Sequence, residues 1–173
     1  MIAKSNLLAA FGLLVLSSLS AQAASDVISA EAVKRNVYVS DSVISGGDAL
    51  ADPMALSAVR WAKNPAGYER IVVDLTGEGS DWQKKGPPYF QVGHDSRTSS
   101  VTLSIRGISR REVTGASLSK ALTKSALISK GYLAPGMEGD LASLEFQTRA
   151  PVDVESFYLT SPPRIVIDVR SKR

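Results

Sequence analysis

The side chains that could perform catalysis are few and lie apart in the sequence. His94 is the only histidine of the 173 residues, so it cannot build a histidine-rich zinc site, and a turn residue is favoured over a general base. Ser117 and Lys120 have the S-x-x-K spacing of a serine nucleophile with a lysine partner, but the other motifs of such enzymes are absent. Glu138 and Asp140 have neighbouring glycines, which indicates a turn. We therefore predict no enzyme, no metal site and no cofactor.

Side chains that suit ligand binding are better represented. The chain has two tryptophans, Trp61 and Trp82, and Lys84 and Lys85 follow the second of them closely. Tyr89 opens an aromatic pair after two prolines. Aromatic rings pack against the apolar faces of sugar rings, and cations bind carboxylates, so these five residues are candidate contacts. Either tryptophan could instead fill the end of a sandwich, an alternative that the sequence favours for Trp61 and leaves open for Trp82.

Two more candidates, Arg70 and Arg164, open the two copies of a repeated segment. The copies read "RIVVDL" (70–75) and "RIVIDV" (164–169). Alternate side chains of a strand share a face, so each copy has one apolar face and one face with Arg, Val and Asp. The Arg and Asp of one copy are about 13 Å apart and cannot pair with each other. Such arginines could grip a carboxylate ligand, although charges in this pattern more often set strand register and solubility.

The repeat predicts a specific arrangement of the two strands. If they lie side by side and antiparallel, with the central valines opposite each other, Arg70 faces Asp168 and Arg164 faces Asp74. A parallel arrangement in register would place arginine beside arginine, which costs free energy. The alternative is that the two copies occupy different sheets of an internally symmetric sandwich.

Period-two alternation predicts most of the remaining elements as strands. We expect a hairpin over 56–76 with a type I turn at 64–67, a second hairpin over 89–94 and 101–107, and strands over 141–148, 152–159 and 163–170. A short strand at 36–40 and one short helix over 117–131, capped by Gly131, complete the set. The order of elements is typical of a mainly-β, antiparallel β-sandwich of two related sheets, or of a barrel.

The chain divides into three parts. Residues 1–23 have the pattern of a cleaved signal peptide, because the apolar run Leu7–Leu19 is too short to span a bilayer and small residues precede a cut after Ala23. The pattern predicts export through the general secretory pathway to the periplasm, with no transmembrane anchor after cleavage; an uncleaved anchor is the disfavoured alternative. We expect residues 24–54 to be a flexible lead-in and residues 55–171 to form one domain, which has no cysteine for disulfides.

The net charge of +3 is too small to indicate a nucleic-acid partner. The densest basic segment, "RGISRR" (106–111), contains no aromatic residue, so we expect a solvated loop there.

The segment from about 56 to 170 resembles the AMIN domain, a periplasmic module of N-acetylmuramoyl-L-alanine amidases and of type IV pilus secretins. The closing strand "PPRIVIDV" (162–169) carries most of the resemblance, followed by "RIVVDL" (70–75). The resemblance implies a β-sandwich of two related sheets that binds peptidoglycan, here as a free-standing module. The expected ligands are glycan strands or stem peptides of the cell wall. The alternative is a protein-interaction module that adds a strand from an envelope complex, such as a secretin or the divisome, to a sheet edge.

Overall fold

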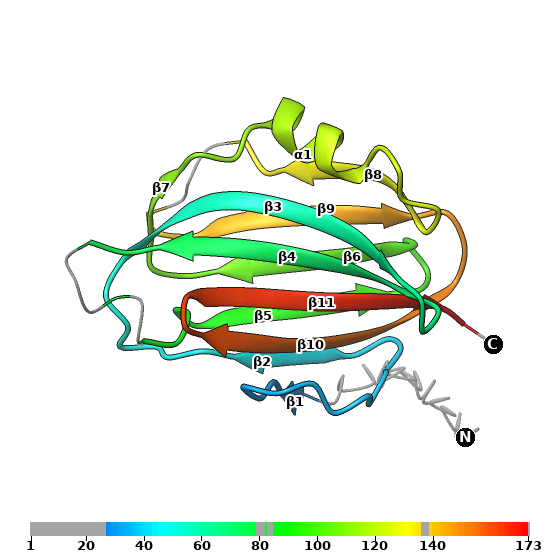
Figure 1. Ribbon diagram of the computed structural model, residues 1–173, viewed down its shortest axis with the longest axis horizontal. Helices are drawn as coiled ribbons and strands as arrows, with labels where there is room; N and C mark the ends of the chain where they lie inside the picture. Colours follow the sequence, from blue (N-terminus) through cyan, green and yellow to red (C-terminus); the bar gives the residue numbers. More distant parts are fainter. Residues whose placement is uncertain (1–26, 79–81, 83–84, 136–138, 173) are drawn as a thin grey trace, which may run out of the picture.

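Two facing β-sheets form the part of the chain that the structure describes (Figure 1). This computed structural model describes residues 27–78, 82, 85–135 and 139–172, so the predicted signal peptide lies outside it. The six-stranded sheet has the order β1 (Val27–Ser29), β2 (Val43–Gly46), β5 (Phe90–Asp95), β6 (Ser100–Ile105), β9 (Ala142–Thr148), β8 (Ile128–Leu133). The five-stranded sheet has the order β10 (Val152–Thr160), β11 (Pro163–Ser171), β4 (Tyr68–Thr76), β3 (Met54–Asn64), β7 (Ile108–Arg111). With the short helix α1 (Gly115–Leu122), the mainly-β sandwich is confirmed.

Most neighbouring strands are antiparallel, as predicted, but both sheets are mixed. β1 pairs with β2 in parallel, and β7 pairs with β3 in parallel. Parallel neighbours need a long crossover connection, and both short outer strands have one. Alternation of apolar residues predicts that a strand exists, but it carries no information on the direction of its neighbour.

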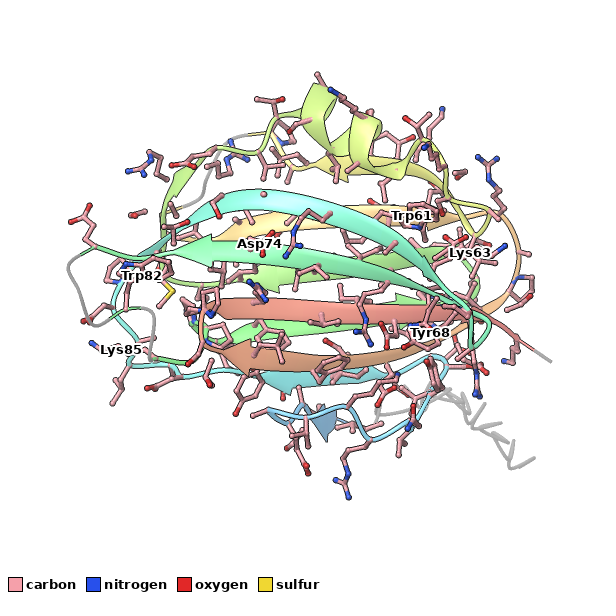
Figure 2. The ribbon with its side chains drawn as sticks, viewed as in Figure 1. Trp61, Lys63, Tyr68, Asp74, Trp82 and Lys85 are labelled. Carbon is pink, nitrogen blue, oxygen red and sulfur yellow. The ribbon has the colours of Figure 1, made fainter. Side chains whose placement is uncertain are left out.

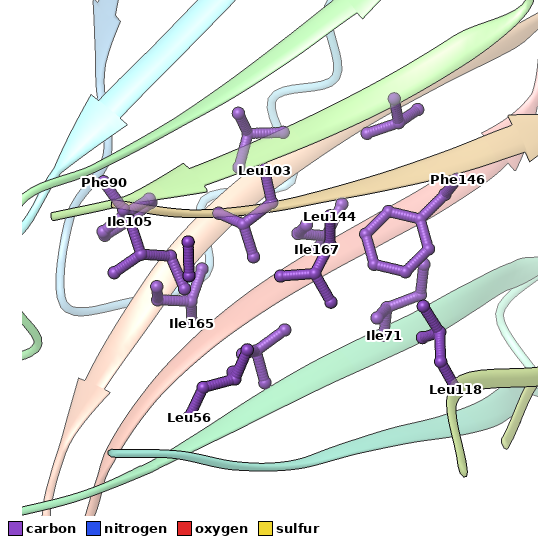
Figure 3. Close-up of a cluster of buried hydrophobic side chains, with 14 of the residues drawn as sticks. Leu56, Ile71, Phe90, Leu103, Ile105, Leu118, Leu144, Phe146, Ile165 and Ile167 are labelled. Carbon is purple, nitrogen blue, oxygen red and sulfur yellow. The ribbon is translucent and has the colours of Figure 1, made fainter. Parts of the chain in front are cut away.

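The core lies between the sheets and is built by alternation. In β4, for example, Ile71, Val73 and Leu75 are buried, whereas the residues between them are partly exposed. Both sheets contribute to the cluster in Figure 3, which includes Leu56, Ile71, Ile165 and Ile167 from one sheet and Leu103, Leu144 and Phe146 from the other. Each fully buried side chain of this size stabilises the fold by about 1.5–3 kcal/mol.

Both predicted hairpins are present. β3 and β4 pair along their lengths, with one bulge between Leu56 and Ala58. Their turn closes through a hydrogen bond from Gly67 N to Asn64 O of 3.1 Å, which is the predicted type of closure. β5 and β6 form the second hairpin in the other sheet.

The two repeated segments lie side by side in one sheet. β11 pairs antiparallel with β4, and Val166 lies opposite Val72. In this register Arg70 faces Asp168 and Arg164 faces Asp74, as the charge pattern predicts. The alternative, in which the copies occupy different sheets, is therefore wrong.

The predicted helix over 117–131 is too long. α1 ends at Leu122, and residues from Ile128 onward form β8. Gly131 is not a helix cap but a strand residue beneath the helix, where an added Cβ would lie 2.8 Å from Leu118 Cγ. Ile128 fits the helical spacing of the apolar residues, which made the predicted helix too long. Its side chain is buried in the core as the first residue of β8. Within the described residues, no helix has the length and apolarity to cross a membrane.

Residues 27–53, which the sequence analysis assigned to a flexible lead-in, belong to the sandwich. They supply β1 and β2, and the connection between these strands crosses the outer edge of β10. We call residues 30–39 the strap. The predicted strand at 36–40 is reduced to a bridge between Val39 and Val154. Short strands separated by Gly, Asp and Pro have too few alternating positions to stand out in the sequence.

The basic segment 106–111 also differs from prediction. Residues Ile108–Arg111 form β7 at the edge of the five-stranded sheet instead of a loop. Ile108 is fully buried, whereas Ser109 and Arg110 are exposed. The burial of Ile108 and the parallel pairing with β3 attach this four-residue edge strand.

Candidate functional site

Trp82 and Lys85 lie in the loop that follows β4, at one end of the sandwich (Figure 2). Trp82 is half-buried against Gly77, where an added Cβ would come within 2.5 Å of the Trp82 Cβ. Lys85 forms an ion pair with Asp52, and its backbone N donates to Trp82 O at 3.1 Å. Lys84 lies outside the described residues. The contacts of Trp82 and Lys85 therefore hold the loop to the body of the protein.

Trp61 lies at the opposite end, near the tip of the β3–β4 hairpin (Figure 2). Its ring packs against the core, and its Nε1 donates to Glu69 Oε2 at 2.9 Å. Glu69 is 3% exposed and also accepts hydrogen bonds from Ser125 Oγ and from the backbone N of Ala126 and Leu127. Trp61 thus fills the end of the sandwich, the alternative favoured by the sequence, and its carboxylate partner holds the segment after α1.

Arg70 and Arg164 are both engaged in pairs between strands. Arg70 donates two hydrogen bonds to Asp168, which is completely buried. Arg164 Nε lies 3.2 Å from Asp74 Oδ1 without an aligned hydrogen bond, and Arg60 donates two hydrogen bonds to the same carboxylate. A ligand carboxylate would therefore compete with Asp168 for Arg70 and with Asp74 for Arg164.

Tyr89 precedes β5 and accepts a hydrogen bond from Gln91 Nε2 of 2.8 Å. The predicted contacts therefore fall on separate parts of the surface. Trp82 and Trp61 lie near opposite ends of β4, whose eight residue steps span about 26 Å. The structure does not bring the candidates together into one site.

The sequence analysis missed a buried charge cluster around Lys34 of the strap. Lys34 Nζ donates to Asp168 Oδ2 at 2.6 Å and also to Glu155, which lies opposite Asp168 in the sheet. The ammonium lies 4.8 Å from the ring centre of Tyr38 and 4.5 Å from that of Tyr68. The cluster fastens the strap to the outer face of the five-stranded sheet. Lys34 is more than 100 residues from Glu155 and from Asp168 in sequence, so no local pattern could reveal these ion pairs.

The residues considered for catalysis have structural partners. His94 is 7% exposed, its Nδ1 accepts a hydrogen bond from Asp41 N at 3.1 Å, and burial lowers the pKa of its imidazole. Ser117 Oγ accepts from Thr114 N and donates to Thr114 O at the start of α1, so the S-x-x-K match belongs to a helix cap. Among the described residues, no group of three or more His, Cys, Asp or Glu could hold a metal ion.

The outer face of the six-stranded sheet carries two shallow grooves that share Thr102. The first, of about 840 Å³, is lined by Asp41, Ser42, Val43, Gly93, His94, Asp95, Ser96, Arg97, Ser100 and Thr102. The second, of about 480 Å³, is lined by Thr102, Tyr132, Leu133, Ala134, Pro135, Ser143, Leu144 and Glu145. Because they meet at one residue, the two grooves form one elongated surface, which we call the groove face.

A single row of residues runs along the groove face, across the strands. Successive pairs in register join Val43 of β2, Gly93 of β5, Thr102 of β6, Glu145 of β9 and Tyr132 of β8. We call these five residues the cross-strand row. Neighbouring strands lie about 4.8 Å apart, so the row is about 19 Å long. A track of this length suits an extended polymer better than a compact small molecule.

The groove face exposes more apolar than polar surface and has few charges. Its acids are Asp41, Asp95 and Glu145, and its one arginine, Arg97, already pairs with Asp95. Hydrogen bonds from the side chain and the backbone of Ser96 lower the pKa of Asp41, so this carboxylate is ionised at neutral pH. The face thus carries a small excess of negative charge. It can offer hydroxyl groups and one half-exposed ring, but no nucleophile with an aligned base.

Comparison with known proteins adds no relative. No protein-family model matches the chain, and no curated protein matches its sequence. The candidate site therefore rests on the geometry of the groove face.

Proposed function

We propose that the chain is a non-enzymatic module of the bacterial periplasm that binds peptidoglycan. The observation that carries this proposal is the groove face: an elongated, shallow and mostly uncharged track across five strands, without reactive groups in place. Polymers of repeating units bind along such tracks through many weak contacts, so we expect modest affinity for any one segment. The signal-peptide pattern of residues 1–23 and the resemblance of residues 56–170 to AMIN domains support the same function.

A sedimentation experiment tests this function directly. The protein without residues 1–23 is mixed with purified sacculi, which are insoluble, and the bound fraction is measured after centrifugation. We expect the protein to sediment with sacculi and to stay in solution without them. Sacculi freed of attached proteins by protease and detergent are the material of choice, because sedimentation with them cannot depend on a protein partner. Failure to sediment with these sacculi contradicts the proposal.

The second candidate function is strand addition by an envelope protein. β1 favours it, because this three-residue strand is the outer strand of its sheet and Val27 is 65% exposed. The other nearby edge, that of β10, is already bonded to the strap: Val154 bonds with Val39 in both directions, and Tyr158 N donates to Glu31 O. Strand addition predicts no sedimentation with protein-free sacculi, so the same experiment distinguishes the two functions.

A further inference from the structure

The floor of the groove face is open at Gly93. Gly93 lies in the middle of β5 and in the cross-strand row, and a Cβ added there would meet no atom within 4 Å. Its neighbour in the row, Thr102, is exposed. A ligand can therefore approach the backbone of β5 more closely than it could over any larger side chain.

Hydroxyl groups lie on the same face of the sheet beside the row. The Thr102 hydroxyl forms no hydrogen bond within the described part of the chain, and the Ser104 and Ser143 hydroxyls lie 3.3 Å apart, a long contact. A hydroxyl both donates and accepts, so it can pair with either partner on a ligand. Sugars with hydroxyl and acetamido groups present both hydrogen-bond donors and acceptors along a glycan chain.

The negative charge of the groove face favours the glycan strand of peptidoglycan over its stem peptide. Stem peptides carry carboxylates, which would need cations, but Arg97 is occupied by Asp95. Glu145, in the centre of the second groove, has no ion-pair partner among the described residues. Repulsion between like charges opposes the binding of an anionic peptide to this face. An uncharged glycan chain meets no such repulsion.

Tyr132 supplies an apolar contact at the end of the row. Its side chain is 47% exposed, although it stands in a strand, and Leu133 and Pro135 line the same groove. A tyrosine ring has only two side-chain torsions, so it offers its face at low entropic cost. The apolar C–H face of a pyranose ring fits such a surface.

From these features we infer that the groove face binds the glycan strand of peptidoglycan, an uncharged N-acetylated polysaccharide, and not its stem peptide. The glycan strand lies along the cross-strand row, with one sugar ring on Tyr132 and the polar groups of other sugars over Gly93 and Thr102. This inference rests on the proposed function and specifies its ligand.

The test uses the tetrasaccharide of β-1,4-linked N-acetylglucosamine as probe, with the protein lacking residues 1–23. Binding is measured by chemical-shift titration, which detects millimolar affinity. We expect Gly93→Phe to abolish binding, because the new ring fills the open floor. Tyr132→Ala should weaken binding roughly tenfold, the loss of one aromatic contact, while Tyr132→Phe should bind like the native protein.

Matched controls separate a filled groove from a damaged fold. Gly115→Phe places the same ring at the start of α1, where an added Cβ also meets no atom within 4 Å, and should leave binding unchanged. Thermal unfolding of each variant confirms that it is folded. A soluble stem peptide and the de-N-acetylated, cationic tetrasaccharide serve as alternative probes. Equal or tighter binding of the stem peptide, or dependence on the positive charge of the sugar, overturns the inference.

The outcomes for the ligand and for the function can be told apart. Sedimentation with sacculi that Gly93→Phe does not reduce leaves the module intact but overturns the site. Sedimentation without binding of the tetrasaccharide overturns the choice of ligand. No sedimentation at all contradicts the proposed function itself. Sedimentation that is lost in Gly93→Phe and kept in Gly115→Phe, together with tetrasaccharide binding, supports both.

Discussion

Arg70 Nε lies 2.7 Å from Asp168 Oδ1 and Arg70 Nη2 lies 2.8 Å from Asp168 Oδ2, a two-pronged pair that joins the two copies of the repeated segment. Lys34 Nζ approaches the same carboxylate from the strap. One completely buried aspartate therefore connects β4, β11 and the strap. The equivalent carboxylate of the other copy, Asp74, lies nearer the solvent, and its ion-pair partners among the described residues are Arg60 and Arg164.

The two copies should differ in their contribution to stability. Asp168→Asn removes the charge that two cations share in a buried place, and we expect it to lower the free energy of unfolding by about 3 kcal/mol. Asp74→Asn makes the same change where Arg60 is mostly exposed, and we expect about 1 kcal/mol or less. Urea unfolding of both variants measures the difference. Equal losses would show that burial of Asp168 does not set its contribution.

Lys34 should make stability sensitive to high pH. Burial alone would lower the pKa of Lys34, but hydrogen bonds to Asp168, Glu155 and Tyr38 raise it above its ordinary value of 10.5. A raised pKa means that the ammonium stabilises the fold fully below pH 10.5 and that this contribution is lost as the pH rises above it. We expect the unfolding temperature to fall more steeply above this pH in the native protein than in Lys34→Met.

Tyr38 is a necessary control, because burial also raises the pKa of its phenol above 10.0 and its ionisation would weaken the fold in the same pH range. In Tyr38→Phe the phenol cannot ionise, and the steep loss due to Lys34 should persist. If Lys34→Met and the native protein respond alike, the ammonium does not fasten the strap.

Because of His94, the free energy of unfolding should fall on mild acidification. Burial lowers the pKa of its imidazole below 6.5, and the neutral Nδ1 accepts the hydrogen bond from Asp41 N. The unfolded chain takes up a proton as the pH falls below 6.5 while the folded chain resists it, so stability declines over that range. In His94→Gln the profile between pH 7 and pH 5 should be flatter. A native profile that is already flat there would count against a neutral, buried His94.

Two glycines of the six-stranded sheet should respond in opposite ways to alanine. In Gly131→Ala the new Cβ would lie 2.6 Å from Leu122 Cδ1 and 2.8 Å from Leu118 Cγ, so α1 must shift, at a cost of about 1–3 kcal/mol. In Gly93→Ala the Cβ has open space, and we expect little change or a gain of about 0.5 kcal/mol from reduced freedom of the unfolded chain. Thermal unfolding of the pair gives the comparison. Similar effects in both would mean that α1 does not pack tightly on β8.

The loop of Trp82 and Lys85 remains the competitor of the groove face for wall binding. We expect Trp82→Ala and Lys85→Ala to sediment with sacculi as the native protein does, because both side chains already contact the body of the protein. Any cost should appear as a small loss of stability instead. Loss of sedimentation in a folded Trp82→Ala variant would move the binding site to this loop.

Much of the sandwich follows from the sequence because its rules are local. Alternation with a period of two defines which side of β4 and of β11 faces the core, and the turn residues 64–67 define the hairpin between β3 and β4. The register of β4 against β11 is also predictable. Only the antiparallel arrangement with valine opposite valine places each arginine beside an aspartate, and strand pairs are selected by such direct neighbours.

The tertiary structure decided what depends on distant neighbours. Lys34 meets Glu155 and Asp168 only after the strap crosses β10. The helix α1 ends at Leu122, and the chain from Ile128 onward pairs as β8. The cross-strand row likewise takes one residue from each of five strands. Strand pairing aligns these five residues, whose spacing along the chain follows no pattern. The sequence by itself determined which side of each strand faces the core and where the turns lie, because both depend on residues close together along the chain. Which surfaces meet, and where a ligand could bind, was decided by burial and register across the whole chain.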